Sequence, residues 1–127
     1  YLNPGHSDEE RSAYWIELDH RFGGQLDWNG LEEARRNLWH RQSHIFGIPF
    51  YYIEYGIAQL GALQVWLNSK RNGEASAIEA YKNALALGGS KPLPQLFEAA
   101  ACRFDFGPEI VEELMTAVRE ELDTLPA

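Results

Sequence analysis

The sequence predicts an all-α fold, a compact bundle of about five to six helices joined by short turns. Apolar residues recur at helical spacing through most of the chain, and glycine pairs and prolines separate these stretches at short intervals. No stretch alternates apolar and polar residues as a half-buried strand does. The 127 residues, 45% of them hydrophobic, suit a single helical domain (1–127) or a fragment of a larger helical domain.

The N-terminal part of the chain predicts two helices. Ser7, followed by three acidic residues, is typical of an N-cap with a capping box, so the first helix follows it and runs to about Phe22. Gly23-Gly24 then ends that helix. Asn29-Gly30 predicts a turn, and apolar residues at helical spacing predict a second helix over about 31–42.

The most apolar segment, from about Pro49 to Lys70, predicts a long, buried central helix that ends near Asn72-Gly73. Pro49 stands where a first helical turn begins, and it forces Ile48 toward an extended conformation. Small residues within this helix predict dense packing, because each glycine costs about 1 kcal/mol in helix propensity. These small residues are Gly56, Ala58, Gly61 and Ala62.

The C-terminal part predicts three further helices. The first covers Glu74 to Leu87 and is ended by Gly88-Gly89. Pro92 and Pro94 open a short helical segment that runs to about Cys102, and Pro108 starts the last helix. The expected apolar positions are Ala75, Ile78, Tyr81 and Leu85 in the first of these helices, and Ile110, Leu114, Val118 and Leu122 in the last.

Composition limits the classes of partner. The formal net charge of −8 disfavours nucleic acid and anionic membrane surfaces, because binding to both depends on Lys and Arg. Small molecules, peptides or proteins are the expected partners. Cys102 is the only cysteine, so no internal disulfide forms, and we expect it to be inert packing. No signal peptide or spanning apolar stretch is recognisable, and we expect a reducing, cytoplasmic location.

The segment from His44 to Trp66 carries the candidate functional residues, a histidine and three tyrosines. On one helix Tyr52 and Tyr55 lie roughly 60° apart, and Tyr51 and Tyr55 roughly 40° apart, so all three serve one side. His44 lies in the segment that precedes that helix. Neutral hydroxyls and a histidine can donate hydrogen bonds to a developing oxyanion. The alternative is an aromatic core whose hydroxyls bond to the backbone.

A zinc site formed by His40 and His44 is disfavoured, although their spacing resembles that of the histidines in H-E-x-x-H. That motif needs a glutamate directly after the first histidine, to act as general base on the metal-bound water. Arg41 stands there instead, a permanent cation beside a dication. We expect His40 to be a surface or capping residue near a helix end.

Three other patterns are better explained by structural roles than by catalysis or ligand binding. Glu54 points about 160° away from the mean direction of Tyr51 and Tyr55, so we expect it on another side of the helix. Residues 88–91 lack the glycine spacing of a phosphate loop and are a helix stop. The acidic runs are expected to be solvated helix faces. These runs are residues 8–10, 112–113 and 120–121.

The segment HIFGIPFYYIEYGIAQLGALQVW, followed by Leu87-Gly88-Gly89-Ser90-Lys91, resembles the C-terminal region of the M3 zinc metallopeptidases, in particular the oligoendopeptidase F branch. The resemblance extends from the first helix to the last, and the middle segment is its most specific part. It implies a predominantly α-helical, cytoplasmic metalloendopeptidase with a deep channel that admits short peptides. In that family zinc is held by the histidines of H-E-x-x-H and a later glutamate.

The resemblance also implies roles for individual residues. His44 resembles a histidine that contacts the substrate, and Tyr52 and Tyr55 resemble a pair of tyrosines that contact the substrate and the tetrahedral intermediate. Tyr51 is a neighbour. The spacing between the histidine and the tyrosines varies by one residue between branches, which leaves open whether Tyr51 or Tyr52 faces the cleft.

The zinc-binding part of such an enzyme is missing, because the sequence contains no H-E-x-x-H motif. In the family the third zinc ligand also lies upstream. The resemblance therefore implies zinc as the cofactor of a parent enzyme, with no metal ligand in this chain. The chain also begins at Tyr1-Leu2-Asn3-Pro4, without methionine. We expect a C-terminal fragment that contributes substrate and oxyanion contacts and is inactive alone.

Two alternatives remain. One is a non-enzymatic helical domain that has kept the fold and a surface for peptides or proteins. The other is a helical scaffold that pairs with another protein through an exposed core face. A fragment exposes apolar surface that the missing part covered, so self-association in solution is expected.

Overall fold

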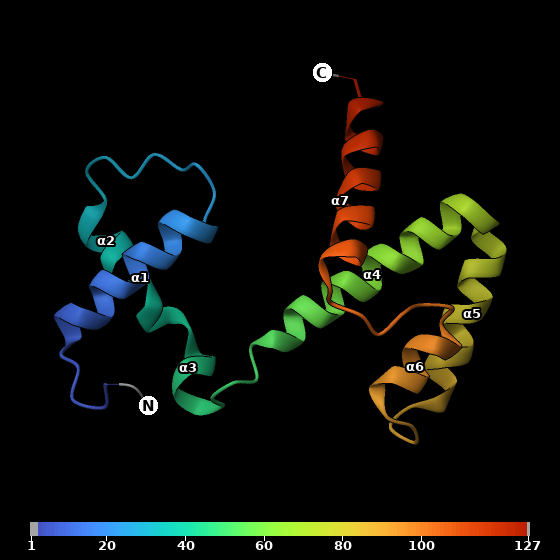
Figure 1. The fold of residues 1–127 in the computed structure, drawn as a ribbon, viewed down its shortest axis with the longest axis horizontal. Helices are drawn as coiled ribbons and strands as arrows, with labels where there is room; N and C mark the ends of the chain where they lie inside the picture. Colours follow the sequence, from blue (N-terminus) through green and yellow to red (C-terminus); the bar gives the residue numbers. More distant parts are fainter. Residues whose placement is uncertain (1–2, 127) are drawn as a thin grey trace. The chain divides into compact units, whose positions relative to one another are not determined.

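The computed structural model describes residues 3–126, which contain helices and turns and no strand (Figure 1). The all-α class is confirmed. Tyr1 and Leu2, which contributed to the expectation of a fragment, lie outside the described residues. The chain divides into two compact units, Tyr1–Tyr52 and Ile53–Ala127, and each is described by itself. That residues 1–127 form one domain stays a prediction.

The first unit begins with the predicted capped helix. The backbone N–H of Glu10 donates to Ser7 Oγ (3.2 Å), and the backbone N–H of Ser7 donates to Glu10 Oε2 (2.7 Å), which completes the capping box. Gly23 ends this helix, as predicted. The helices of the unit are α1 (Asp8–Phe22), α2 (Glu32–Arg36), the 3-10 helix η1 (Leu38–Arg41) and α3 (Ser43–Gly47).

The prediction of one helix over 31–42 is wrong, because the chain breaks at Asn37 between α2 and η1. The Asn37 side chain donates to the backbone oxygen of Glu33 (3.0 Å) and to its carboxylate (2.8 Å). Such local bonds from asparagine compete with the helical backbone pattern. The break and the short α3 raise the helix count above the predicted five to six.

Trp39 fixes the packing of the first unit. Its side chain is buried (7% exposed), and its indole N–H donates to the hydroxyl of buried Ser12 on α1 (3.2 Å). A second indole, that of Trp15, donates to the backbone oxygen of Arg35 (3.1 Å). Arg35 in turn forms an ion pair with Asp19 (2.6 Å), so α1 and α2 are joined by two side-chain contacts.

The long helix begins at Ile53 and not at Pro49, so the predicted start is wrong. Phe50 has a φ of 67°, in the left-handed region, and a residue in that conformation cannot continue a right-handed α-helix. Residues 49–52 form a turn instead. Tyr51 and Tyr52 therefore do not lie on the long helix.

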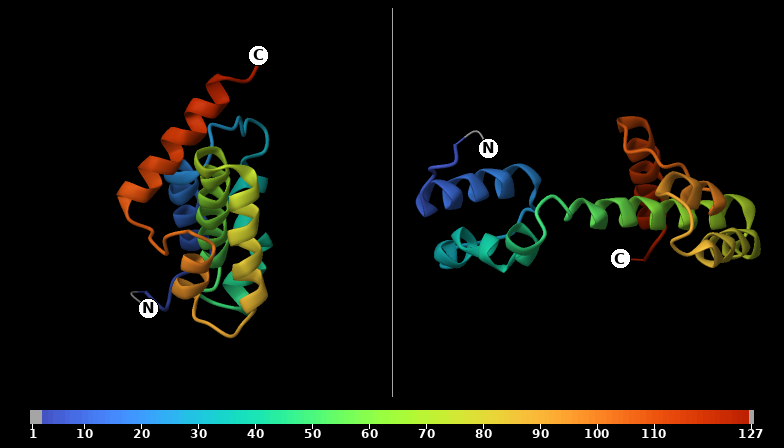
Figure 2. Two further views of the ribbon diagram at one scale, coloured as in Figure 1. Left: turned by 90° about the vertical axis from the view of Figure 1, so that its right-hand side faces the viewer. Right: turned by 90° about the horizontal axis from the view of Figure 1, so that it is seen from below.

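The second unit consists of four helices that follow one another through short connections (Figure 2). Helix α4 packs against both α5 and α7, and α5 packs against α6. The predicted ends of α5 and the predicted start of α7 are confirmed. The helices are α4 (Ile53–Asn72), α5 (Glu74–Leu87), α6 (Leu93–Ala99) and α7 (Pro108–Asp123).

The core of this unit lies between α4 and α7. Ile110 and Leu114 are almost fully buried against Leu67, which confirms two of the predicted core positions of the last helix. Leu122 is 60% exposed, so its predicted place in the core is wrong. Partly buried side chains pack around this cluster, namely Leu60, Leu63, Trp66 and Ala117.

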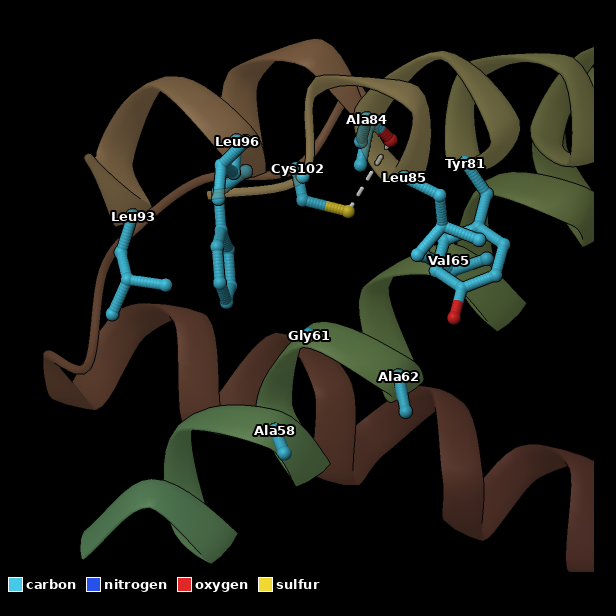
Figure 3. Close-up of a pocket in the computed structure, with 13 residues that line it drawn as sticks. Ala58, Gly61, Ala62, Val65, Tyr81, Ala84, Leu85, Leu93, Leu96 and Cys102 are labelled. Carbon is cyan, nitrogen blue, oxygen red and sulfur yellow. Dashed lines mark hydrogen bonds between the residues drawn. The ribbon is translucent and has the colours of Figure 1, made fainter. Parts of the chain in front are cut away.

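The apolar stripe predicted for α5 is wrong. Ala77 is its buried residue, whereas Ile78, Tyr81 and Leu85 are 43%, 45% and 60% exposed. Ala75 is exposed as well. Tyr81 and Leu85 border a cavity and do not pack into a solid core (Figure 3).

Helix α4 is buried only in its second half, so the prediction of a wholly buried helix is wrong in its first turns, where Ile53 is 66% exposed. Dense packing is confirmed at Gly61, where an added Cβ would lie 3.1 Å from Phe97 Cζ on α6. It is wrong at Gly56, where an added Cβ would meet only Ile53 Cδ1 at 3.8 Å. Ala58 and Ala62 line the cavity.

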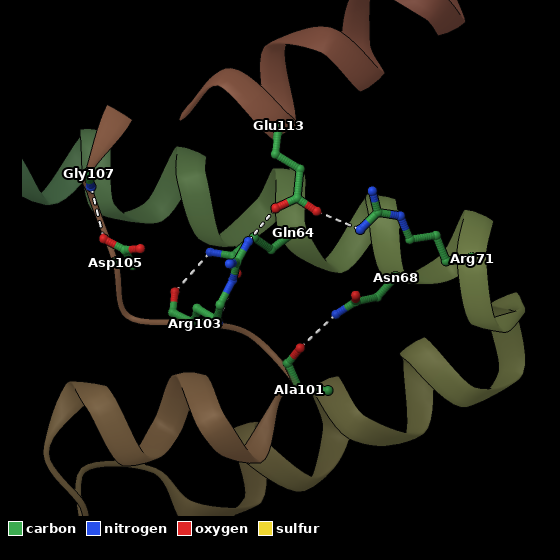
Figure 4. Close-up of polar contacts among 8 residues, drawn as sticks. All are labelled: Gln64, Asn68, Arg71, Ala101, Arg103, Asp105, Gly107 and Glu113. Atoms are coloured by element: carbon green, nitrogen blue, oxygen red, sulfur yellow. Dashed lines mark hydrogen bonds and ion pairs between the residues drawn. The ribbon is translucent and has the colours of Figure 1, made fainter. Parts of the chain in front are cut away.

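The segment between α6 and α7 is held by side chains of α4 (Figure 4). The buried amide of Gln64 donates to the backbone oxygen of Arg103 (2.9 Å) and accepts from its backbone N–H (2.7 Å). One turn further along α4, Asn68 donates to the backbone oxygen of Ala101 (2.8 Å). These bonds satisfy backbone groups that lie outside any helix.

Replacing Gln64 by Leu should lower the free energy of unfolding by about 2 kcal/mol, because both backbone groups of Arg103 lose their partners inside the protein. Urea unfolding followed by circular dichroism measures this change. Gln95→Leu on the exposed face of α6 is the control and should change stability by less than about 0.5 kcal/mol. Equal effects of the two substitutions would contradict the role of Gln64.

Candidate functional site

The structure brings two of the predicted site residues together. The rings of His44 and Tyr52 meet edge to face, with centroids 5.0 Å apart and an interplanar angle of 88°. His44 lies in the short helix α3, ahead of the long helix α4, as predicted. The turn at 49–52 sets the distance between His44 and Tyr52.

The position of His44 depends on the packing of α3. Phe46, two residues further along α3, stacks on Trp39 with ring centroids 5.8 Å apart and an interplanar angle of 28°. Trp39 itself donates a hydrogen bond to Ser12 on α1. The chain of contacts from α1 through Trp39 to α3 therefore holds the histidine in a defined place.

Tyr51 lies in the same turn as Tyr52, and its backbone N–H donates to the backbone oxygen of Ile48 (3.3 Å). The two tyrosines are almost equally exposed, at 49% and 48%. The helical angles used to place Tyr51 and Tyr52 beside Tyr55 do not apply, because neither of them is helical.

Tyr55 lies in the first turn of α4, in the second unit, and is 61% exposed. His44, Tyr51 and Tyr52 lie in the first unit. Glu54, expected on another side of the helix, also lies in the first turn of α4 and is exposed.

In the part of the chain that the structure describes, no three His, Cys, Asp or Glu side chains lie close enough together to hold a metal ion. His40 and His44 fall in different elements, η1 and α3, so they do not share a helical face. The His40 ring lies against Trp39, with centroids 4.0 Å apart. The described residues do not fit the zinc site that the family resemblance implies for a parent enzyme.

A cavity of about 520 Å³ lies among α4, α5 and α6 (Figure 3). Small side chains of α4 and α5 form two of its walls, and Phe97 and Leu93 of α6 form a third. Sequence reasoning missed this cavity. The small residues that signal it were interpreted as dense packing, and a helical spacing of alanine and glycine is compatible with both outcomes.

Cys102 lies at the inner end of this cavity and is 8% exposed. Its thiol donates to the backbone oxygen of Ala100 (3.4 Å). Burial raises the pKa of the Cys102 thiol, because a thiolate there would lose its hydration. The thiol is therefore a poor nucleophile at neutral pH.

A second, polar cavity of about 230 Å³ lies between α4 and α7. Glu113 on α7 accepts from Arg71 (2.6 Å) and from Arg103, and these partners lower the pKa of its carboxyl below the usual 4.5, with the Arg71 bond the largest cause. Lys70 and Glu121 form a further ion pair between the same helices (2.7 Å). Glu113 and Glu121 stay partly exposed, as expected for a solvated helix face, and each also forms an ion pair with a side chain of α4.

No family model matches the chain, and neither a curated protein nor a solved structure matches it. Among the described helices, none is long and apolar enough to cross a membrane.

The Glu113 ion pairs predict a pH dependence of stability. A carboxyl whose pKa is lowered by folding stabilises the protein above its ordinary pKa, and this contribution is lost as the pH falls through the lowered value. Glu113→Gln should therefore destabilise the protein at pH 7, and the difference from the unsubstituted protein should shrink toward about pH 3. Urea unfolding from pH 7 to about pH 3 measures this difference in the free energy of unfolding.

Glu112→Gln provides the matched control, because that neighbouring side chain is exposed. It should leave the free energy of unfolding nearly unchanged at every pH. A constant difference between Glu113→Gln and the unsubstituted protein from pH 7 to about pH 3 would contradict the ion-pair account.

Proposed function

We propose that this chain supplies substrate and oxyanion contacts to a zinc-dependent oligopeptidase, a metalloendopeptidase that hydrolyses short peptides. The observation that carries the proposal is the ring contact between His44 and Tyr52. The resemblance of residues 44–66 to the oligoendopeptidase F branch of the M3 metallopeptidases gives that contact its interpretation.

The chemistry of these side chains suits the stabilisation of negative charge. A tyrosine hydroxyl is a neutral donor, and a donor held in place before the reaction costs no reorganisation when the carbonyl oxygen becomes an oxyanion. Contact with His44 restricts the orientation of the Tyr52 ring, while 48% of Tyr52 stays exposed and accessible to a peptide. Tyr55 is the second proposed oxyanion donor, and His44 and Tyr51 are proposed substrate contacts.

The zinc ion and the residues that bind it would belong to a longer parent protein. The absence of an H-E-x-x-H motif from the sequence supports this division. A bound zinc ion would supply an activated water and polarise the scissile carbonyl. We also propose a cytoplasmic location and self-association of the isolated chain through its exposed apolar side chains.

The isolated chain should not hydrolyse peptides. Incubated with zinc and a fluorescence-quenched oligopeptide, it should show no turnover above buffer, because its residues provide no metal-bound nucleophile. The quenched-peptide assay with a known zinc peptidase as positive control measures this. Zinc-dependent cleavage that copurifies with the chain and is abolished by a chelator would overturn the proposed division of roles.

In a parent enzyme that carries H-E-x-x-H, Tyr52→Phe and Tyr55→Phe should each lower kcat by about 100-fold with little change in KM, because each removes one donor to the transition state. Tyr14→Phe is the control, since Tyr14 is 61% exposed on α1. A loss confined to peptide binding, with kcat unchanged, would exclude the oxyanion role.

A non-enzymatic helical domain that binds peptides or proteins is the second candidate. The many exposed large apolar side chains favour it, for example Phe50 at 79% and Phe22 at 72%. The upstream reading frame distinguishes the two candidates, because a peptidase must encode H-E-x-x-H there and a binding domain need not.

A further inference from the structure

We propose that the cavity among α4, α5 and α6 binds a small, uncharged, largely apolar molecule that carries one hydrogen-bonding group. The cavity lies wholly within the second unit. The proposal is independent of peptidase activity, since it uses none of the proposed substrate or oxyanion contacts.

The size of the cavity fits a ligand. Its volume of about 520 Å³ falls within the range of roughly 300 to 1,000 Å³ that small-molecule sites occupy. Residues from three different helices surround it, so a bound molecule would be covered from several sides (Figure 3). The cavity opens to solvent, since Tyr81, Leu85 and Leu93 in its lining are 45%, 60% and 46% exposed, so a ligand can enter it.

The helix packing keeps this cavity open. Phe97 of α6 already reaches the backbone of α4 at Gly61, where its ring lies 3.1 Å from the position of an added Cβ. Helix α6 therefore cannot move closer to α4 at that point. Ala62 of α4 and Ala84 of α5 also line the cavity, and their side chains are too short to fill the space that remains.

The lining of the cavity determines the charge of the ligand. No charged side chain lines it, and the chain as a whole carries a formal net charge of −8. An anion would lose its hydration on entry and find no counter-charge, and the surrounding negative field would repel it. The neutral Cys102 thiol adds no charge. An uncharged molecule is the complementary occupant.

Tyr81 supplies the polar group of the site. Its side chain extends from α5 toward α4 with the hydroxyl at its end (Figure 3), and Tyr81 is 45% exposed, so a ligand can reach this hydroxyl. A ligand with a single donor or acceptor near this point would gain a hydrogen bond, while the rest of its surface meets alanine, leucine and phenylalanine.

The smaller cavity between α4 and α7 is a poorer candidate. Its charged side chains, Arg71, Arg103 and Glu113, already bind one another. A ligand there would have to break these pairs before it could bind.

N-phenyl-1-naphthylamine is a suitable probe, because it is uncharged, apolar, carries one N–H and fluoresces when it leaves water. Titrated into the protein at micromolar concentration, it should bind saturably at one site per chain. Ala62→Leu and Ala84→Leu place larger side chains in the cavity from α4 and α5, and each should weaken binding at least tenfold. Tyr81→Phe should weaken it about fivefold, through the loss of one hydrogen bond.

Two matched controls make the test specific. Ala75→Leu places the same side chain on an exposed part of α5 outside the cavity and should leave the affinity unchanged. The sulfonated form of the probe, 8-anilinonaphthalene-1-sulfonate, has the same ring system with a negative charge and should bind at least tenfold more weakly than the neutral probe. Circular dichroism confirms that each variant is folded.

Several results would overturn the proposal. These are the absence of saturable binding, equal affinity in Ala62→Leu, Ala84→Leu and the unsubstituted protein, and equal affinity for the neutral and sulfonated probes. A second copy of the chain is the competing occupant. If probe binding disappears as the protein concentration rises and sedimentation shows a dimer that Ala62→Leu abolishes, the cavity is a dimer interface and the small-molecule proposal fails.

Discussion

The paired hydrogen bonds between the Gln64 side chain and the Arg103 backbone organise the second unit. Just after helix α6, Ala101 adopts a left-handed conformation (φ 55°). The backbone N–H groups of Ala101 and Cys102 donate hydrogen bonds to the backbone oxygens of Glu98 (2.9 Å) and Phe97 (2.8 Å). This is the Schellman pattern, with alanine where glycine is usual. Arg103 follows directly and meets Gln64, so α4 holds the segment that leads from α6 to α7.

Helix α4 consequently serves two environments at once. Leu67 faces the solid core that α7 closes, whereas Ala58 and Ala62 face the open cavity beside α5 and α6. The same helix is thus well packed on one face and incompletely packed on the other. Ion pairs from Lys70 and Arg71 to α7 reinforce the packed face. They are exposed pairs, so they contribute less than the apolar burial of Ile110 and Leu114.

The sequence was a reliable guide at three helix ends that carry a local signal, although the same kind of signal at Pro49 did not start the long helix. The capping box at Ser7, the left-handed Gly88 and the proline at the start of α7 are such signals, and all three helix ends were predicted. It failed where a competing contact decides the outcome, as at Asn37, whose side chain bonds break the helix expected over 31–42. The cavity was missed for a different reason: alanine at helical spacing predicts a narrow helix face, but only the position of Phe97 decides whether a neighbour fills the space.

The left-handed Phe50 changes how the candidate tyrosines are related to one another. On a continuous helix, the backbone alone would fix all three hydroxyls in one register. With a turn at 49–52, Tyr52 is instead oriented by its contact with His44, and that contact depends on Trp39 and the packing of α3. Tyr55 takes its orientation from α4, a separate and longer element. The two proposed oxyanion donors are therefore positioned by different elements, a turn for Tyr52 and a helix for Tyr55.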